Sequence, residues 1–115
     1  MKILVTGGRD FDQADVVNQT LDELHAQTPI TLLVHGAAKG ADRLAAAWAA
    51  TNGVPEHASK PNYGRYGRGA GLKNNDDMLA TQPDLVVAFP GGKGTADMVR
   101  RARNAGLKVQ QVIAE

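Results

Sequence analysis

Two glycine-rich segments carry the residue types that could bind a small anion. The first reads "TGGRDF" at positions 6–11, the second reads "PGGKGT" at positions 90–95, and each connects an apolar run to a helix-like pattern. Glycine lets backbone N–H groups approach a ligand without a Cβ in the way. The start of a helix adds unpaired N–H groups and a partial positive charge that favours phosphate. Neither segment has the P-loop or dinucleotide-binding spacing, so a phosphate site and a simple tight turn are both open.

The first of these segments contains two charged side chains. Arg9 could hold a phosphate through two parallel N–H bonds, and Asp10 could accept a ribose hydroxyl or cap the helix that follows. A third segment, "HGAAKGADR" at 35–43, repeats the strand-to-helix design and offers Gly36 and Lys39 as ligand contacts. The three segments together predict a binding site for a phosphorylated compound.

One carboxylate has the right position for catalysis. Asp97 follows the second glycine segment, where it could stabilise the oxocarbenium-like state of a ribosyl bond in cleavage. Its alternative role is that of an acid in the first turn of a helix, which stabilises the helix dipole. Asp10, His35 and Asp42 lie near strand ends and are candidates for a second catalytic group, although a histidine that ends a buried strand is more often structural. The histidines lack ligand spacing and there is no cysteine, so we expect no metal site and no cofactor.

Alternating strand and helix patterns run along the chain. Continuous apolar runs at 2–6 and 30–36 predict buried strands, and the run at 84–89 predicts a third strand. A last strand is expected at 108–113, and a weaker one at 54–59. Helical patterns span 11–27, 40–53, 74–82 and 95–106, with Asn74 or Asn75 and Thr95 as expected N-caps of the last two. The glycines of 61–71 predict a loop. This alternation predicts an α/β fold, a Rossmann-like open parallel sheet of about five strands with helices on both faces.

The sheet would bring the two glycine segments together. In an open parallel sheet, ligands bind at the carboxyl ends of the strands, where the strand order reverses. If the first strand is central, the segments 6–11 and 90–95 should therefore lie side by side across a crevice.

Length and composition narrow the class of protein. The chain has 115 residues, a net charge of +1 and 43% hydrophobic residues, which predict a single domain over 1–115. It has no apolar run near the ~20 residues of a membrane span and no secretory signal pattern, so we expect a cytoplasmic protein with no membrane partner. The near-neutral charge makes nucleic acid an unfavoured partner. Residues 60–73 are locally basic and contain Tyr63 and Tyr66. The segment could bind a small anionic ligand whose base stacks on a tyrosine, form an oligomer surface, or be a solvated loop.

Several motifs in the same order resemble the SLOG superfamily, in its small single-domain, YspA-related branch. They are "MKILVTGGRDF", "HGAAKGADRLAAAWA", "GLKNNDDML" and "PDLVVAFPGGKGTADMVRRA", and they cover nearly the whole chain. The superfamily includes the LOG-type nucleoside-monophosphate phosphoribohydrolases, the DNA-processing protein DprA and sensor domains of antiviral systems. The resemblance implies a Rossmann-like fold and a nucleotide-derived ligand, and members of this branch are often carried by phages and mobile elements.

The resemblance also implies roles for individual residues. In the LOG enzymes a stretch like 90–95 holds the nucleotide phosphate, and Asp97 falls on the first of the acids that assist bond cleavage. Met98 stands where the second acid would be, and Asn74 stands where an arginine helps catalysis, with Asn75 at the next matching position. These departures favour binding over hydrolysis.

We therefore expect a protein that binds a nucleotide or nucleotide-derived phosphorylated ribosyl ligand, for sensing or sequestration. The alternatives are a LOG-like phosphoribohydrolase that acts through Asp97 and DprA-like binding of single-stranded DNA. Because the crevice of so small a chain would be shallow, we also expect a homo-oligomer, a dimer or tetramer, with sites near the subunit contact. The expected ligand-binding residues are Gly7, Gly8, Arg9, Asp10, Gly36, Lys39, Asn75, Pro90, Gly91, Gly92, Lys93, Gly94 and Thr95.

Overall fold

Five parallel strands form one sheet in the computed structural model, which describes residues 1–113. The strands are β1 (Lys2–Thr6), β2 (Leu32–His35), β3 (Glu56–Ala58), β4 (Leu85–Ala88) and β5 (Val109–Gln111), in the order β3-β2-β1-β4-β5. β1 is the central strand, and its Ile3 pairs in register with Leu33 on one side and Leu85 on the other. The predicted parallel sheet is confirmed, including the weaker strand within 54–59.

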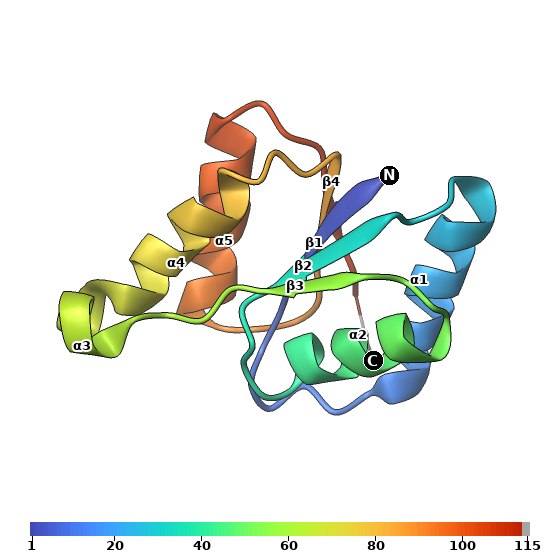
Figure 1. Cartoon of the computed structure of the whole chain (residues 1–115), viewed down its shortest axis with the longest axis horizontal. Coiled ribbons are helices and arrows are strands. Elements are labelled where there is room, and N and C mark those ends of the chain that lie inside the picture. Colours follow the sequence, from blue (N-terminus) through green and yellow to red (C-terminus); the bar gives the residue numbers. More distant parts are fainter. Residues whose placement is uncertain (114–115) are drawn as a thin grey trace.

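Helices cover both faces of this sheet, as predicted. They are α1 (Ala14–Gln27), α2 (Ala41–Thr51), α3 (Tyr63–Tyr66), α4 (Ala70–Leu79) and α5 (Lys93–Asn104), with a 3-10 helix at Gly67–Gly69 between α3 and α4. In Figure 1, α1 and α2 lie to one side of the strands and α4 and α5 to the other. Among the described residues, no helix combines the length and apolar character needed to cross a bilayer.

The two faces of the sheet form two separate cores. Successive side chains of a strand point to opposite faces, so Val5 packs with the residues of α1 and α2, while Leu4 packs with Met78 of α4 and Met98 of α5. Trp48 is 3% exposed in the first core and donates a 2.8 Å hydrogen bond from Nε1 to Asp22. Burial on both faces explains why β1, β2 and β4 read as continuous apolar runs.

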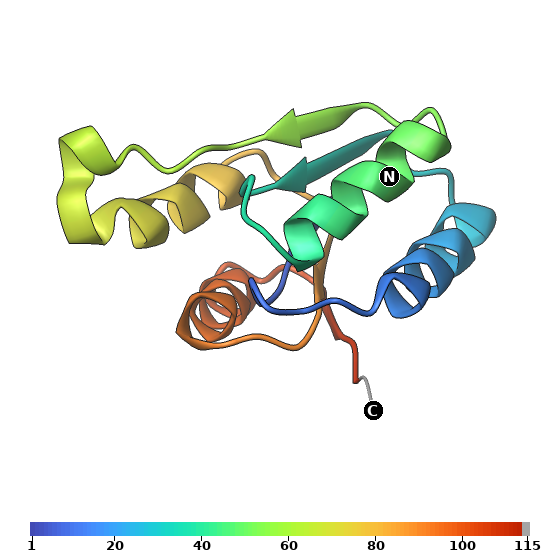
Figure 2. The ribbon, with the colours of Figure 1, turned by 90° about the horizontal axis from the view of Figure 1, so that it is seen from below.

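The start of α4 and the segment before it differ from the prediction. Residues 61–71 are not a loop: they contain α3 and the 3-10 helix, which project from one end of the molecule (Figure 1, Figure 2). α4 begins at Ala70, so the prediction of Asn74 or Asn75 as its N-cap is wrong. Both asparagines are buried in the middle of α4.

The start of α5 differs by two residues. The helix begins at Lys93 with Gly92 as its N-cap, so the prediction of Thr95 in that role is wrong. No side chain caps this end of α5. Its first N–H groups are therefore left without the side-chain partner that an N-cap residue usually supplies.

Candidate functional site

The two glycine-rich segments meet at the carboxyl ends of β1 and β4. These strands are neighbours in the sheet, and the connection after β1 is joined to the connection after β4 by a 2.9 Å hydrogen bond from Gly8 N to Pro90 O. Phe89 N donates a second 2.9 Å bond to Thr6 O just before them. The predicted juxtaposition of the segments 6–11 and 90–95 is confirmed.

The glycines of these two segments and of the segment 35–43 serve two different purposes. A Cβ added to Gly91 would lie 2.3 Å from Thr95 Oγ1 and 2.7 Å from Gly8 N, and one added to Gly40, whose φ is +73°, would lie 2.2 Å from Gly8 O. These two glycines allow backbone to pack against backbone. A Cβ added to Gly92 or Gly94 would meet no atom within 4 Å, so these two leave space open at the start of α5.

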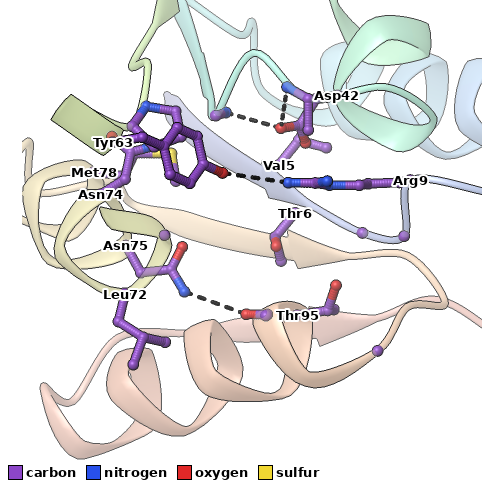
Figure 3. Close-up of a pocket in the computed structure, with 18 of the residues that line it drawn as sticks. Val5, Thr6, Arg9, Asp42, Tyr63, Leu72, Asn74, Asn75, Met78 and Thr95 are labelled. Carbon is purple, nitrogen blue, oxygen red and sulfur yellow. Dashed lines mark hydrogen bonds between the residues drawn. The ribbon is translucent and has the colours of Figure 1, made fainter. Parts of the chain in front are cut away.

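A cavity of about 460 Å³ opens at this point (Figure 3). It is bounded by the connections that follow β1 and β2, by the first turn of α5 and by one side of α3 and α4. The residues expected to bind ligand that line it are Gly7, Gly8, Arg9, Gly36, Asn75, Gly92, Gly94 and Thr95. The structure therefore brings residues from three separate segments and from α4 to one cavity.

The other expected ligand-binding residues lie around this cavity rather than in its wall. Asp10 and Lys39 line a neighbouring cavity of about 540 Å³. Pro90 and Gly91 line a cavity of about 430 Å³ toward β5. Lys93 is exposed at the start of α5 and belongs to none of these three linings.

Asp97 is also outside the lining of the three cavities. Its Oδ1 accepts a 2.6 Å hydrogen bond from Arg100 Nη2, and its Oδ2 accepts bonds of 2.7 Å from Arg101 Nε and 3.0 Å from Asn75 Nδ2. Burial alone would raise the pKa of this carboxyl, but the hydrogen bonds from Asn75, Arg101 and Arg100 outweigh burial, and the pKa lies below its ordinary value. Both oxygens are thus engaged in joining α5 to itself and to α4.

Asn75 connects α4 to the start of α5. Besides its bond to Asp97, its Nδ2 donates to the carbonyl of Gly94 at 3.2 Å, and in Figure 3 its side chain extends from α4 toward the first turn of α5. The side chain that lines the cavity therefore also holds the cavity floor in place. Asn75 was expected to bind ligand, and the structure places it in the cavity wall.

Asp42 is a second buried carboxylate, and it lines the cavity. Its Oδ2 accepts hydrogen bonds from Gly36 N at 3.0 Å and Ala38 N at 3.2 Å. Burial is the largest influence and raises the pKa of Asp42, although the N–H groups of Ala38 and Gly36 and the nearby His35 act against it. Asp42 shapes the connection after β2 and presents a carboxyl group to the cavity.

His35, at the end of β2, faces a different partner. Its Nδ1 accepts a 3.0 Å hydrogen bond from Ala37 N, which leaves the proton on Nε2, and Nε2 lies 3.0 Å from Glu56 Oε2 on β3. This is the structural role that the sequence favoured for His35, and it places the imidazole outside the lining of the cavity.

Most of the wall formed by α3, α4 and the 3-10 helix between them was not predicted from the sequence, apart from Asn75 and the suggestion that Tyr63 could stack on a base. Tyr63 lines the cavity together with Arg68, Leu72, Asn74 and Met78, and the last four were not expected to contact a ligand. Arg9 Nη2 lies 3.4 Å from the Tyr63 hydroxyl across the cavity (Figure 3). The basic, glycine-rich composition of 60–73 was the feature of the sequence that indicated a binding surface there. The position of this surface in the cavity depends on contacts with segments far away in sequence, which composition does not reveal.

Comparison with known proteins identifies the family. The family model of the YspA, cpYpsA-related SLOG family matches residues 1–66. The gene 61 protein of Mycobacterium phage D29 is 34% identical over 117 residues, which cover 94% of this chain and 93% of that protein. A phage relative agrees with the predicted link to phages.

Solved structures share the fold. DNA processing protein A (DprA) from Streptococcus pneumoniae superposes with a TM-score of 0.80 at 18% identity, over 99% of this chain and 50% of that one, so the chain spans half of DprA. The Moco carrier protein from Chlamydomonas reinhardtii gives 0.72 at 24% identity, over 96% and 75% of the two chains. The protein TM1055 gives 0.74 at 18% identity, over 94% and 71%. The family match covers more than half of the chain and the phage relative nearly all of it, and the chain therefore belongs to the YspA, cpYpsA-related SLOG family.

Proposed function

We propose that this protein binds a nucleotide-derived ligand, a phosphorylated ribosyl compound, in the cavity at the carboxyl ends of β1, β2 and β4. The observation that carries the proposal is the uncapped start of α5, where Gly92 and Gly94 place no side chain in the cavity floor. The first N–H groups of a helix have no partner within the helix and attract phosphate. A volume of about 460 Å³ lies within the range of about 300–1,000 Å³ that is usual for small-molecule sites.

The side chains around this floor suit the phosphate charge, the base and the ribose of such a ligand. Arg9 and Arg68 line the cavity and supply positive charge for a phosphate. Tyr63, Leu72 and Met78 line the opposite wall, where an aromatic ring and apolar side chains can pack against a base. The carboxyl group of Asp42 can accept a ribose hydroxyl.

The contacts of Asp97 support binding of the ligand without cleavage of its ribosyl bond. Cleavage of a ribosyl bond needs a carboxylate at the anomeric carbon, and both Asp97 oxygens are bonded to Asn75, Arg100 and Arg101. Incubation with 5′-AMP should therefore leave the base attached, as followed by liquid chromatography. Release of adenine that disappears in Asp97→Asn would establish hydrolysis instead.

Native mass spectrometry of freshly purified protein tests the proposal directly. We expect a co-purified small molecule that contains phosphate, and calorimetry should show that 5′-AMP binds while adenosine binds at least about tenfold more weakly, a difference of about 1.4 kcal/mol. Arg9→Ala should weaken 5′-AMP binding, whereas Arg43→Ala, an exposed arginine of α2 outside the cavity lining, should not. Equal binding of adenosine and 5′-AMP would contradict the phosphate site.

A further inference from the structure

We propose that the binding groove contains a second anion-binding subsite, lined by Lys39 and Lys60, and that the ligand carries two separated anionic groups, as a dinucleotide does. This inference rests on the proposed function, because it extends the same groove. Its basis is a second cavity that adjoins the first and has an excess of positive charge in its lining.

The two cavities have a common wall. The cavity of about 540 Å³ shares five lining residues with the cavity of about 460 Å³: Arg9, Gly36, Ala38, Pro61 and Tyr63. The start of α5 and the α4 side chains line only the first cavity, whereas Ala37, Lys39 and Lys60 line only the second. The first cavity is thus centred on the floor at α5, and the second on the connection after β2 and the segment before α3.

The Arg9–Tyr63 contact marks the boundary between the two parts. Both side chains are exposed, Tyr63 to 54%, and the 3.4 Å separation between Arg9 Nη2 and the Tyr63 hydroxyl is long for a hydrogen bond. Such a contact is weak and can be exchanged for ligand contacts. Figure 3 shows Arg9 reaching across the first cavity toward Tyr63, so its guanidinium group can contact anions on either side.

The second cavity has more positive than negative charge. Arg9, Lys39 and Lys60 line it, and Asp10 is the one carboxylate in its wall. Within residues 1–113 neither lysine forms an ion pair. Free cations around a concave surface raise the local concentration of anions. A second phosphate, separated from the first by the width of the Arg9–Tyr63 boundary, therefore has a place to bind.

A comparison of two ligands by calorimetry tests the subsite. The probes are 5′-AMP, with one phosphate, and the linear dinucleotide pApA, with two phosphates that a ribose separates. We expect pApA to bind at least tenfold more tightly than 5′-AMP. The Lys39→Ala/Lys60→Ala variant should bind pApA only as tightly as 5′-AMP, and its affinity for 5′-AMP should stay within twofold of the wild type.

A matched control removes the same charge elsewhere. Arg43 and Lys108 are exposed and line neither cavity, so Arg43→Ala/Lys108→Ala should leave the affinity for pApA unchanged. The subsite would be overturned if pApA bound no more tightly than 5′-AMP, or if the Lys39/Lys60 variant lost affinity for both ligands equally; the proposed function would then still stand. Failure of both ligands to bind would overturn the proposed function itself.

One further measurement distinguishes a small dinucleotide ligand from the end of a longer nucleic-acid strand. The second phosphate of pApA could belong to a free dinucleotide or to the end of a longer nucleic acid. We expect the ten-residue oligonucleotide (dA)10 to bind no more tightly than pApA. Affinity that rises with strand length and falls steeply with salt would contradict the proposal and favour a nucleic-acid site.

Discussion

Asp97 and Asp42 are both buried carboxylates, but their surroundings shift their pKa values in opposite directions. Asp97 accepts hydrogen bonds from two arginines and an asparagine, which outweigh burial and lower its pKa. Asp42 accepts backbone N–H bonds that do not outweigh burial, and its pKa is raised. The two residues should therefore change the stability of the protein differently with pH.

Asp97→Asn should destabilise the protein at pH 7 by about 1–3 kcal/mol, because hydrogen bonds to charged groups are lost. A carboxyl whose pKa is lowered by folding contributes stability above its unfolded pKa of about 3.9, and that contribution disappears as the pH falls through the folded value. Urea unfolding should show the full difference from wild type at pH 7 and a smaller one near pH 3. Asp12→Asn, at an exposed position, is the control; a difference that does not depend on pH would contradict this role.

Asp42→Asn should leave the protein at least as stable as wild type at pH 7. A carboxyl whose pKa is raised by folding favours the folded state at pH values below its unfolded pKa, and this advantage is lost as the pH rises through the folded value. The asparagine oxygen can still accept the N–H bonds of Gly36 and Ala38. Thermal unfolding at pH 7 should show an equal or higher Tm for the variant, with the gain absent near pH 4. A lower Tm at pH 7 would show that the charge itself stabilises this connection.

Asn74 and Asn75 show what could not be predicted at the scale of residues. Asparagine is a favoured N-cap, and the sequence placed these two at the start of a helix. In the structure their side chains are satisfied by partners far away in sequence: Asn74 bonds with Ser59, and Asn75 bonds with Gly94 and Asp97. Such tertiary contacts override the local preference, and no local pattern reveals them.

Among the elements, the strands β1, β2 and β4 were predictable because each is buried on both faces and leaves a continuous apolar run. The helix of residues 63–66 and the 3-10 helix after it were not, since four glycines within 61–71 and the lack of apolar periodicity concealed them. The same contrast holds for the two sides of the cavity. The glycine-rich side was predicted from the sequence. The side formed by α3 and α4 was not, except for Asn75 and the suggestion that Tyr63 could stack on a base.

Alanine substitutions should separate the two kinds of glycine in the connection after β4. Gly91→Ala should destabilise the protein by about 1–3 kcal/mol through overpacking, because its Cβ would contact Thr95 Oγ1 and Gly8 N. Gly94→Ala should be neutral or stabilising by up to about 1 kcal/mol, because it replaces a helical glycine beside open space. Denaturant unfolding of both variants gives the comparison.

The same Gly94→Ala variant should bind 5′-AMP at least about tenfold more weakly than wild type, since its methyl group would enter the floor of the cavity. Gly69→Ala, whose added Cβ also meets no atom within 4 Å but lies outside the cavity lining, should bind normally. Unchanged binding by Gly94→Ala would show that the ligand does not contact the start of α5.

At the scale of the whole molecule, large apolar side chains are exposed at the end formed by α3 and the start of α4. Tyr63, Tyr66 and Leu72 are exposed there by 54%, 38% and 46%, and the segment projects beyond the sheet (Figure 2). Exposed apolar groups gathered in this way are typical of interaction surfaces. This supports the expectation of a homo-oligomer with ligand sites near the subunit contact.

Light scattering after size-exclusion chromatography should therefore give a mass of at least two chains at micromolar concentration. Tyr66→Ser should shift the population toward single chains, because this exposed ring lies outside the cavity lining and its loss removes only surface contacts. A single-chain mass for the wild type at that concentration would contradict the expectation.

The hydrogen bond between Gly8 and Pro90 bears on how relatives of this protein can diverge. Because this bond joins main-chain atoms, substitution of neighbouring side chains does not remove its donor or its acceptor. The facing wall is built from side chains of residues 61–78. Relatives with other side chains in that wall can therefore line the cavity differently while they keep the main-chain bond between the two connections.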